Sequence, residues 1–361
     1  MRIAFLVNNY PPHVGGLEMH VHALACALRG RGHDVTVVAL SDSPGESDEE
    51  DMHVIRLRER FRIADVLAFP PLGTARRLRQ MLRDGGFDLV SVHTRFFPMT
   101  WLGVDAARAC GIPVVVTEHG SGYVASNSPI IAVASRIVDL TFGRRALRRA
   151  SHVIGVSENA VAFVKRLSGA EAEVFYNAID LPAQAPETPA RNPKHLVFVG
   201  RLVPGKGWEA FMETVTQLRA KGFDVTGSLL GNGPDEEAAR RAAPDGVTVH
   251  GRVSPAEVGV QLRGATLVNP TVLSEGFQTT LLEALAAGGQ VVTYPVPGAQ
   301  VLADDGAPVT ITDRRDQTSL RQAVEAVLDD PGEPYPWRKL EKWSWRNRAA
   351  QFEAIAAELI R

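Results

Sequence analysis

Residues 195–208 read HLVFVGRLVPGKGW, and this stretch decides the fold class. Its first five residues have the composition of a buried strand, and a helical pattern begins near Trp208. The same order of strand, loop and helix recurs along almost the whole chain. Because the strands are nearly continuous apolar runs joined by helices, the pattern predicts parallel sheets covered by helices on both faces.

The chain is long enough for two such α/β domains. Segment 181–194, LPAQAPETPARNPK, holds four prolines and reads as a linker. We place the first domain at 1–184 and the second at 185–336, and we expect the helical tail 337–361 to pack back on the first. Strands are expected at 3–7, 34–40, 53–58, 88–93, 113–119, 152–157 and 173–177, then at 195–201, 225–231, 247–252, 266–271, 290–295 and 307–312, with helices in the first half at 17–30, 73–84 and 130–149.

Composition bounds the class of protein. The 361 residues are 45% hydrophobic with a net charge of −2, which gives no general attraction to nucleic acid. No window approaches the roughly 18 apolar residues of a membrane span, and we see no signal-peptide pattern, so we expect a cytoplasmic protein. Cys26 and Cys110 lack metal-ligand spacing and are expected to be buried, reduced thiols. The acidic segment 42–51 is expected to be a solvated loop.

The loop GRLVPGKG (200–207) nearly satisfies the phosphate-loop pattern G-x-x-x-x-G-K-[ST]. That pattern needs a Ser or Thr hydroxyl to hold Mg²⁺, and Gly207 cannot supply one, which argues against an NTPase. Arg201 and Lys206 remain, two cations beside a helix N-terminus that can neutralise a diphosphate without metal. A solvated Arg and Lys in a surface loop is the alternative.

Glu275 and Glu283 lie eight positions apart in SEGFQTTLLEALAAGG (274–289). On a helix that begins near Gln278 they are separated by roughly 10–12 Å, too far for an acid–base pair on one bond. The spacing suits a ligand with hydroxyls at both ends and a diphosphate between them. Glu283 is flanked by apolar residues, so a buried carboxylate there needs partners such as ribose hydroxyls. A capped helix with one exposed Glu is the alternative. The N–H groups expected to face an anion are those of Gly276, Phe277, Gln278 and Thr279.

Two weaker signals lie in the first domain. Gly15-Gly16 follow the first strand and precede a helix, where an anion or sugar can approach the backbone, although a lone Gly-Gly is more often an ordinary turn. No G-x-G-x-x-G follows that strand, which argues against a dinucleotide-binding fold. His119, in TEHG, and His93 end neighbouring strands, where each can bond a substrate hydroxyl or be purely structural.

In combination these segments resemble the retaining nucleotide-sugar glycosyltransferases of family 4, which have the GT-B fold. The resemblance covers nearly the whole chain. Its most specific part is Glu275-x7-Glu283, similar to the family's E-x7-E signature, followed by FVGRLVPGKGW, similar to its diphosphate-binding loop. Softer matches are Gly15-Gly16, VSEN (156–159), YNAID (176–180) and LLGNGP, which ends at Pro234. The resemblance implies two Rossmann-like, doubly wound domains that face a cleft.

The resemblance also implies a role for each matching residue, with no metal and no cofactor. His119, Arg201, Lys206 and Glu275 would act in catalysis, His119 near the reacting carbon of the sugar. Arg201 and Lys206 would hold the diphosphate, and Glu283 the ribose hydroxyls. Arg252 and Val253 would contact the base, Glu275, Gly276 and Phe277 the sugar, and Gly15 and Gly16 the phosphates, with Gly231, Gln278 and Thr279 completing the donor site. Gln278 stands where the family commonly has Gly, so the identity of the sugar stays open.

The implied reaction is front-face displacement with retained configuration, in which a hexose leaves a UDP- or GDP-type donor and the departing phosphate takes the acceptor's proton. The expected acceptor is a hydroxyl of a glycolipid, a lipid-linked saccharide or a cell-surface polysaccharide precursor. Basic segments at 56–62, 76–83 and 143–149, interleaved with Phe61, Val66, Leu67 and Phe69, could rest on anionic lipid and so favour a lipid-linked acceptor at the inner membrane face. Helix faces with ordinary Arg content are the alternative. A nucleotide-sugar 2-epimerase and a non-catalytic nucleotide-sugar-binding protein are the rival functions.

Overall fold

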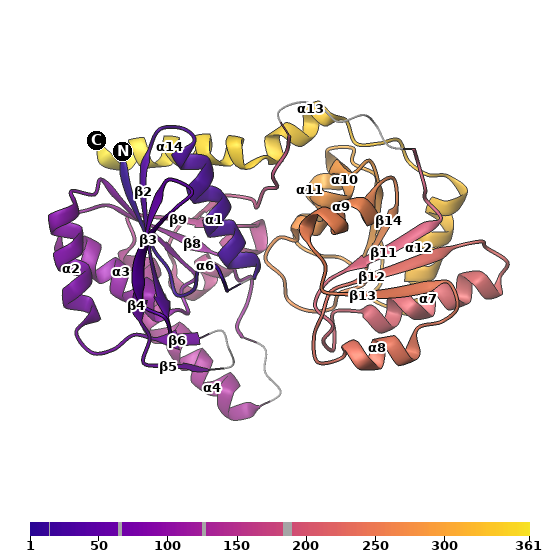
Figure 1. The fold of residues 1–361 in the computed structure, drawn as a ribbon, viewed down its shortest axis with the longest axis horizontal. Helices are drawn as coiled ribbons and strands as arrows, with labels where there is room; N and C mark the ends of the chain where they lie inside the picture. The colour runs from indigo at the N-terminus through magenta and orange to yellow at the C-terminus, as the bar shows by residue number, and fades with distance from the viewer. Residues whose placement is uncertain (14, 64–66, 125–127, 183–189) are drawn as a thin grey trace. The chain divides into compact units, whose positions relative to one another are not determined.

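The computed structural model describes residues 1–13, 15–63, 67–124, 128–182 and 190–361. The chain divides into two compact units, which we describe separately (Figure 1). Unit 1 comprises Met1–Asp180 and Ser344–Arg361, and unit 2 comprises Leu181–Trp343. The boundary that the sequence predicts between 184 and 185 lies outside the described residues, and the chain rejoins unit 1 at Ser344 rather than at Trp337.

Unit 1 is built on an eight-stranded sheet in the order β10-β9-β8-β7-β1-β2-β4-β3. All neighbours are parallel except β3, which pairs antiparallel with β4. The strands are β1 (Arg2–Leu6), β2 (Asp34–Ser41), β3 (Gly45–Glu49), β4 (Met52–Arg58), β7 (Leu89–His93), β8 (Val114–Glu118), β9 (His152–Gly155) and β10 (Glu173–Val174), with a separate hairpin of β5 (Phe61–Ile63) and β6 (Leu67–Phe69).

Helices cover both faces of this sheet, as the near-continuous apolar strands require. Ile3 and Phe5 of β1 point to one face, whereas Ala4 and Leu6 point to the other, and all four are fully buried. The helices are α1 (Gly16–Arg29), α2 (Thr74–Gly85), α3 (Pro98–Ala109), α4 (Pro129–Val138), the π-helical turn η1 (Asp139–Gly143), α5 (Arg144–Arg149), α6 (Glu158–Ser168) and α14 (Trp345–Ile360).

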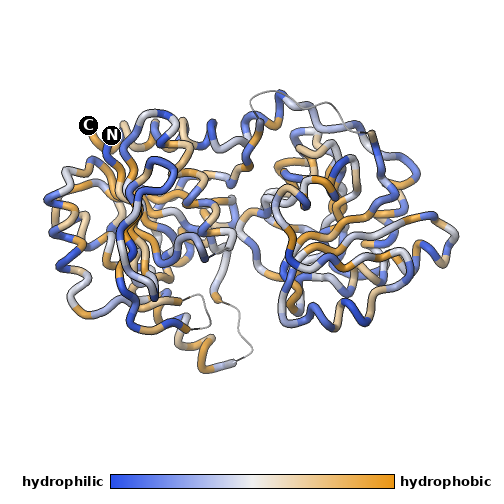
Figure 2. Tube along the Cα trace, viewed as in Figure 1, coloured by the Kyte–Doolittle hydropathy of each residue, from blue (hydrophilic) through white to orange (hydrophobic). Residues whose placement is uncertain are grey.

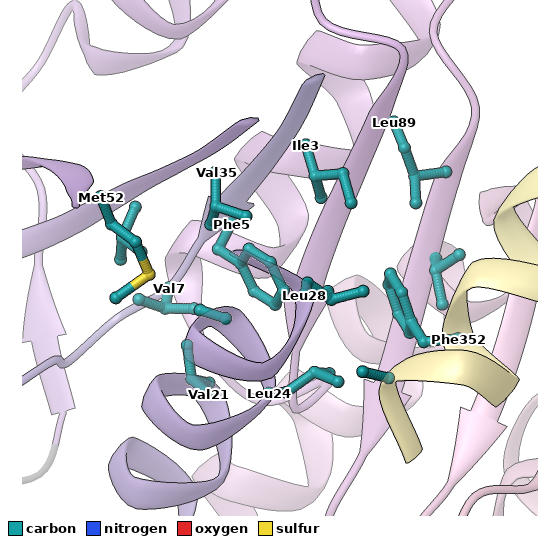
Figure 3. Close-up of a cluster of buried hydrophobic side chains, with 14 of the residues drawn as sticks. Ile3, Phe5, Val7, Val21, Leu24, Leu28, Val35, Met52, Leu89 and Phe352 are labelled. Carbon is teal, nitrogen blue, oxygen red and sulfur yellow. The ribbon is translucent and has the colours of Figure 1, made fainter. Parts of the chain in front are cut away.

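The C-terminal helix α14 completes the core of unit 1. Its Phe352 ring lies 6.3 Å from the ring of Phe5, and both are buried between β1, α1 and α14. Figure 3 shows Phe5, Leu28 and Phe352 pointing toward one another from these three elements. The end of the chain is therefore part of the hydrophobic core of the unit that contains its beginning.

Two details of unit 1 differ from the sequence prediction. The acidic segment 42–51 is not simply a solvated loop, because Gly45–Glu49 pairs with β4 as an edge strand. The helix expected over 130–149 is interrupted by η1, where the buried Asp139 pairs with the buried Arg95. Both differences arise from pairing with another segment, β4 in the first case and Arg95 in the second, which the residue pattern of each segment alone does not encode.

Unit 2 is built on a fully parallel six-stranded sheet in the order β13-β12-β11-β14-β15-β16. Figure 2 shows the central strands of both units as largely hydrophobic segments. No helix among the described residues is long and apolar enough to span a membrane. The elements are β11 (His195–Val199), α7 (Trp208–Ala220), β12 (Thr226–Leu230), α8 (Glu236–Ala242), β13 (Val247–Gly251), α9 (Pro255–Leu262), β14 (Thr266–Asn269), α10 (Thr279–Ala286), β15 (Gln290–Thr293), α11 (Ala299–Asp304), β16 (Val309–Ile311), α12 (Gln317–Asp329), α13 (Trp337–Leu340) and η2 (Glu341–Trp343).

Candidate active site

Three loops interlock at the carboxyl ends of β11, β12 and β14. A Cβ atom on Gly231 would lie 1.8 Å from the carbonyl oxygen of Gly200, and one on Gly233 would lie 2.2 Å from that of Leu202. Such separations are far below van der Waals contact, so the loops can approach this closely only where glycine stands. Ligands bind at this edge of the sheet in open α/β folds, and here the backbones of neighbouring loops lie in close contact along it.

Gly207 explains why the loop after β11 ends without a hydroxyl. Its φ is 96°, a left-handed conformation that favours glycine, and it is the N-cap of α7. A Cβ atom there would lie 2.4 Å from the carbonyl oxygen of Pro270. A Ser or Thr at this position would both strain the backbone and collide with the loop after β14. The close packing of these two loops therefore requires glycine at the position where a phosphate loop carries its Mg²⁺-binding hydroxyl.

Lys206 and Glu275 meet across the same junction. Lys206 Nζ donates a hydrogen bond to Glu275 Oε1 over 2.6 Å, and both side chains are largely buried, 18% and 22% exposed. The backbone also joins the loops, because the N–H of Val272 donates to the carbonyl oxygen of Gly205 over 2.9 Å. The folded chain therefore joins the two segments that the sequence singled out separately, while Arg201 beside them is exposed.

Helix α10 begins at Thr279, four residues after Glu275. Gln278 is its N-cap and Thr279 its first residue, so these residues lie at the positive end of the helix, as predicted. Phe277 is buried and stacks on Trp343 with the ring centroids 5.7 Å apart, which fixes the chain on either side. Its backbone is the part that remains to contact a ligand.

Gln278, the departure from the family pattern, is held by the sheet. It is 8% exposed, and its Oε1 accepts a hydrogen bond from Asn269 Nδ2 over 2.6 Å. Asn269 in turn donates to Thr293 Oγ1. The side chain therefore joins α10 to β14 and β15, a structural role that glycine could not fill.

Glu283 lies on α10, one turn after Thr279, and is half-buried. Burial raises the pKa of its carboxyl group, and a hydrogen bond with Thr279 partly offsets that effect. An ionised carboxylate in this position gains stability from any further hydroxyl donors. On the neighbouring loop after β13, Arg252 is exposed and Val253 is half-buried.

In unit 1, the predicted glycines form the start of α1. Gly15 is the N-cap and Gly16 the first helical residue. A Cβ atom on Gly16 would meet no atom within 4 Å, whereas one on Gly15 would meet only the flexible carboxylate of Glu18. The backbone of this turn is consequently open to approach.

The predicted His93 and His119 belong to a cluster with His20, which sequence reasoning missed. His93 Nδ1 and His119 Nε2 are 3.1 Å apart, and the ring centroids of His20 and His119 are 4.6 Å apart, edge to face. His20 Nδ1 lies 2.7 Å from Asn177 Oδ1, in the YNAID segment. The three rings are near enough to share a metal ion. However, Nδ1 of His93 and Nε2 of His119 already form a hydrogen bond with each other. The only signal of His20 in the sequence is its position on the apolar face of the predicted helix.

The hydrogen bonds in this cluster select a tautomer. Ser91 Oγ lies 3.2 Å from His93 Nε2, and among the described residues it has no other partner. Because a buried hydroxyl needs an acceptor for its proton, Ser91 donates to His93 Nε2. Neutral His93 then carries its proton on Nδ1 and donates to His119 Nε2. His119 is left with its proton on Nδ1, as a hydrogen-bond donor.

The loop that carries His119 is anchored by a buried ion-pair network. Arg95 Nη1 donates to Glu118 Oε1 over 2.8 Å, and Arg95 Nε lies 3.0 Å from Asp139 Oδ1. Glu118 also accepts hydrogen bonds from the N–H groups of Arg95 and Gly120. All three charged side chains are at most 3% exposed. The backbone on both sides of His119 is therefore fixed.

The predicted basic surface of unit 1 is divided by ion pairs. Arg56 and Arg62 pair with Glu49 and Glu59 and point inward. Arg145 and Arg149 both lie near Asp105. On α2, by contrast, four arginines are exposed. The exposed arginines of α2 are Arg76, Arg77, Arg79 and Arg83.

The apolar residues predicted to lie among the basic segments are partly exposed. Phe61 is 49% exposed, Leu67 and Phe69 are half-buried, and Val66 lies outside the described residues.

Helix α4 carries an apolar surface that the sequence did not mark. Ile130 is 80% exposed, Val133 60% and Ile137 57%, and only Ser135 of the helix is buried. These side chains line one shallow depression. Within 128–151 the only acidic residue is Asp139, which is buried against Arg95. The exposed charge of this segment is therefore entirely basic.

The family model described as Glycosyltransferase Family 4 matches residues 14–182, and the one described as Glycosyl transferases group 1 matches residues 193–330. The chain is 27% identical to a GDP-mannose-dependent alpha-(1-6)-phosphatidylinositol monomannoside mannosyltransferase of Mycolicibacterium smegmatis, over 97% of each chain. It is 28% identical to the glycogen synthase of Mycobacterium tuberculosis, over 92% of this chain and 87% of the relative.

A solved structure of Anabaena Alr3699/HepE in complex with UDP has the same fold, with a TM-score of 0.73 and 18% identity over 99% of this chain and all of the other. Its likeness supports the fold alone. The first model covers most of the parallel sheet of unit 1, and the second covers the parallel sheet of unit 2. The chain belongs to the group 1 glycosyltransferases of the GT-B fold.

Proposed function

We propose that this protein transfers a hexose from a UDP- or GDP-linked donor to a hydroxyl acceptor, with retention of configuration and without a metal at the donor. The observation that carries the proposal is the contact between Lys206 and Glu275. The contact places a cation that can bind a diphosphate next to a carboxylate that can bind sugar hydroxyls. Glu283, half-buried on α10, takes the ribose hydroxyls, and Arg201 is the second cation.

The reaction follows from where charge develops. As the bond between the sugar and the diphosphate breaks, negative charge grows on the phosphate oxygens. Arg201, Lys206 and the N-terminus of α10 stabilise that charge, and the ion pair with Glu275 holds Lys206 in place before the reaction begins. The phosphate oxygen then accepts the proton of the attacking hydroxyl on the same face of the sugar. His119, a neutral donor through Nδ1–H, bonds a sugar hydroxyl and orients the ring.

The acceptor that we propose is lipid-linked, and it is reached at an anionic membrane surface. The apolar α4 and the arginines of segment 128–151 support this proposal, since apolar side chains can enter the headgroup region while arginines pair with lipid phosphates. In Figure 1, α4 extends beyond the strands of unit 1. Two relatives, the monomannoside mannosyltransferase and a phosphatidyl-myo-inositol mannosyltransferase of Mycolicibacterium smegmatis, are named for phosphoinositide acceptors.

Incubation of the purified enzyme with each donor, with and without acceptor lipid, tests the reaction. A transferase should release nucleoside diphosphate slowly when the donor is present without acceptor, and faster when the acceptor is added. NMR of the product should show that the transferred sugar keeps the configuration that it has in the donor. An epimerase would instead change the donor sugar when no acceptor is present. Inversion at the transferred carbon would contradict front-face displacement.

Sedimentation with vesicles that contain anionic phospholipid tests the membrane contact. We expect Ile130→Asp and Val133→Asp to weaken binding, while Val260→Asp, a matched change at a 53% exposed residue of unit 2, leaves it unchanged. Equal binding by all three variants would overturn the docking role of α4.

A further inference from the structure

Three metal-ligating side chains of different kinds converge in unit 1 on a surface that the donor site does not use. His22 and Cys26 lie one turn apart on α1, so their side chains share one face of the helix. Glu50 reaches them from the turn between β3 and β4. Cys26 Sγ lies 3.0 Å from Glu50 Oε2 and 3.7 Å from His22 Nε2, and His22 Nε2 lies 3.5 Å from Glu50 Oε2.

These separations fit a tetrahedral zinc ion. Bonds of about 2.3 Å to sulfur and about 2.0–2.1 Å to nitrogen and oxygen place the ligand atoms about 3.3–3.6 Å apart. The three measured separations, 3.0, 3.5 and 3.7 Å, bracket that range. A thiolate, an imidazole and a carboxylate are also a ligand combination that zinc accepts readily, with a fourth position left for water.

The turn that presents Glu50 is unusual for its residues. Glu50 has φ 50° and Asp51 has φ 60°, left-handed conformations that two-residue hairpin turns normally assign to Asn or Gly. The hairpin is tied to α1 by Arg29, whose Nε donates to the carbonyl oxygen of Asp51 over 2.8 Å. The Glu50 carboxylate is therefore brought to the face of α1 that carries His22 and Cys26.

A buried partner already orients the imidazole. The hydroxyl of Tyr10, a residue only 3% exposed, lies 2.9 Å from His22 Nδ1. This contact leaves Nε2, the nitrogen that faces Cys26 and Glu50, as the ligand atom. An outer hydrogen bond on the second ring nitrogen is the usual companion of a metal-bound histidine.

We propose that His22, Cys26 and Glu50 form a zinc site that joins α1 to the β3–β4 hairpin. On binding, the Cys26 thiol releases its proton to solvent and Zn²⁺ takes the place of that proton between sulfur and carboxylate. The thiolate and the carboxylate together balance the charge of the ion. Because α1 begins at the Gly15–Gly16 turn, the ion stabilises the element that supports this turn. The site is structural and takes no part in sugar transfer.

Metal titration of the full-length protein, stripped with a chelator, tests the site. We expect one Zn²⁺ per chain and a rise in Tm on binding, because the ion binds the folded state. Substitution with Co²⁺ should give the d–d bands of a tetrahedral ion and a thiolate-to-cobalt absorption in the near ultraviolet. Cys26→Ser should abolish that absorption, and Glu50→Gln should weaken binding. Tyr10→Phe should lower the affinity about tenfold.

Two matched variants serve as controls. Cys110→Ser removes the other free cysteine, and His53→Gln removes a histidine of the same hairpin that lies near Glu46 and Asp48. Both should keep the stoichiometry, the affinity and the cobalt spectrum of the wild type. The proposal is overturned if Cys26→Ser retains wild-type affinity, or if the cobalt complex of the wild type lacks thiolate absorption. Tm values of the metal-free variants identify any loss that comes from misfolding.

Discussion

Lys206 and Glu275 lie 69 positions apart in the sequence, yet Lys206 Nζ donates to Glu275 Oε1 over 2.6 Å. The contact is possible because glycines at the neighbouring positions let the loops after β11 and β14 pack backbone to backbone. A charge held in this way does not need to reorganise when the transition state forms. In the proposed reaction, the ion pair therefore keeps the ammonium group in place until a diphosphate arrives.

Replacement of Lys206 by Ala should lower kcat by about 10²- to 10³-fold, since the ammonium group stabilises charge that grows as the diphosphate leaves. Initial rates of nucleotide release in the presence of acceptor measure the effect. Lys221→Ala removes a surface lysine of unit 2 that pairs with Glu325, and its rate should equal that of the wild type. A Lys206→Ala enzyme with normal turnover would remove the diphosphate role.

Glu283→Gln should act on donor binding. A carboxylate that bonds ribose hydroxyls contributes equally to the ground state and the transition state, so KM for the donor should rise about tenfold or more while kcat changes little. Glu325→Gln is the matched control. If KM for the donor stays at its wild-type value, Glu283 has only a structural role in α10.

Ser91→Ala should disturb His119 without touching the substrate. Loss of the hydroxyl frees His93 to carry its proton on either nitrogen, and His119 Nδ1 then no longer has to be a donor. We expect a lower kcat with nearly unchanged KM for the donor, and a smaller loss than in His119→Ala. A Ser91→Ala enzyme with wild-type kcat would show that the tautomer does not matter.

Acid should destabilise unit 1. Burial lowers the pKa of His20 from 6.5 to about 4 and holds those of His93 and His119 well below 6.5. Between these values the unfolded chain binds protons that the folded chain does not, so stability falls as pH falls below about 6.5. His20 alone accounts for about 2 kcal/mol between pH 7 and pH 5.

Urea unfolding at several pH values measures this slope. His20→Gln should flatten it, whereas His53→Gln, at a side chain 42% exposed, should not. Stability that is equal at pH 7 and pH 5 would mean that the cluster accepts protons in the folded state.

Transfer itself should not depend on divalent metal, because in the proposed reaction Arg201 and Lys206 supply the positive charge at the diphosphate. Enzyme treated with a chelator should keep its initial rate, and added Mg²⁺ or Mn²⁺ should not raise it. The rate is best measured well below Tm, where removal of Zn²⁺ from the site at Cys26 affects stability alone. A strict requirement for Mg²⁺ would contradict the metal-free donor site.

The sequence predicted the parts of the structure that depend on local pattern. Apolar runs predicted the strands of both sheets apart from β3, and the sequence itself shows that Gly207 offers no hydroxyl in the loop after β11. It could not reveal the close approach of Gly207 to Pro270, which depends on two loops far apart in the chain.

Pairing between one segment and another, near or far along the chain, accounts for the rest. The acidic 42–51 reads as a loop because nothing in it is apolar, but β4 supplies a hydrogen-bonding edge for Gly45–Glu49. Pairing also brings Glu50 to Cys26, so ligand spacing along the sequence gave no sign of that cluster. His20 was hidden in the same way, since its partner Asn177 lies 157 positions away.

We propose that the loops after β11 and β14 together bind the diphosphate of a sugar nucleotide. The most direct test is a thermal-shift panel of UDP-, GDP-, ADP- and TDP-sugars on the wild type and on Lys206→Ala. We expect at least one UDP- or GDP-sugar to raise the Tm of the wild type, and we expect Lys206→Ala to lose most of this rise. A wild type whose Tm responds to no sugar nucleotide, or a variant that responds equally, would contradict this proposal.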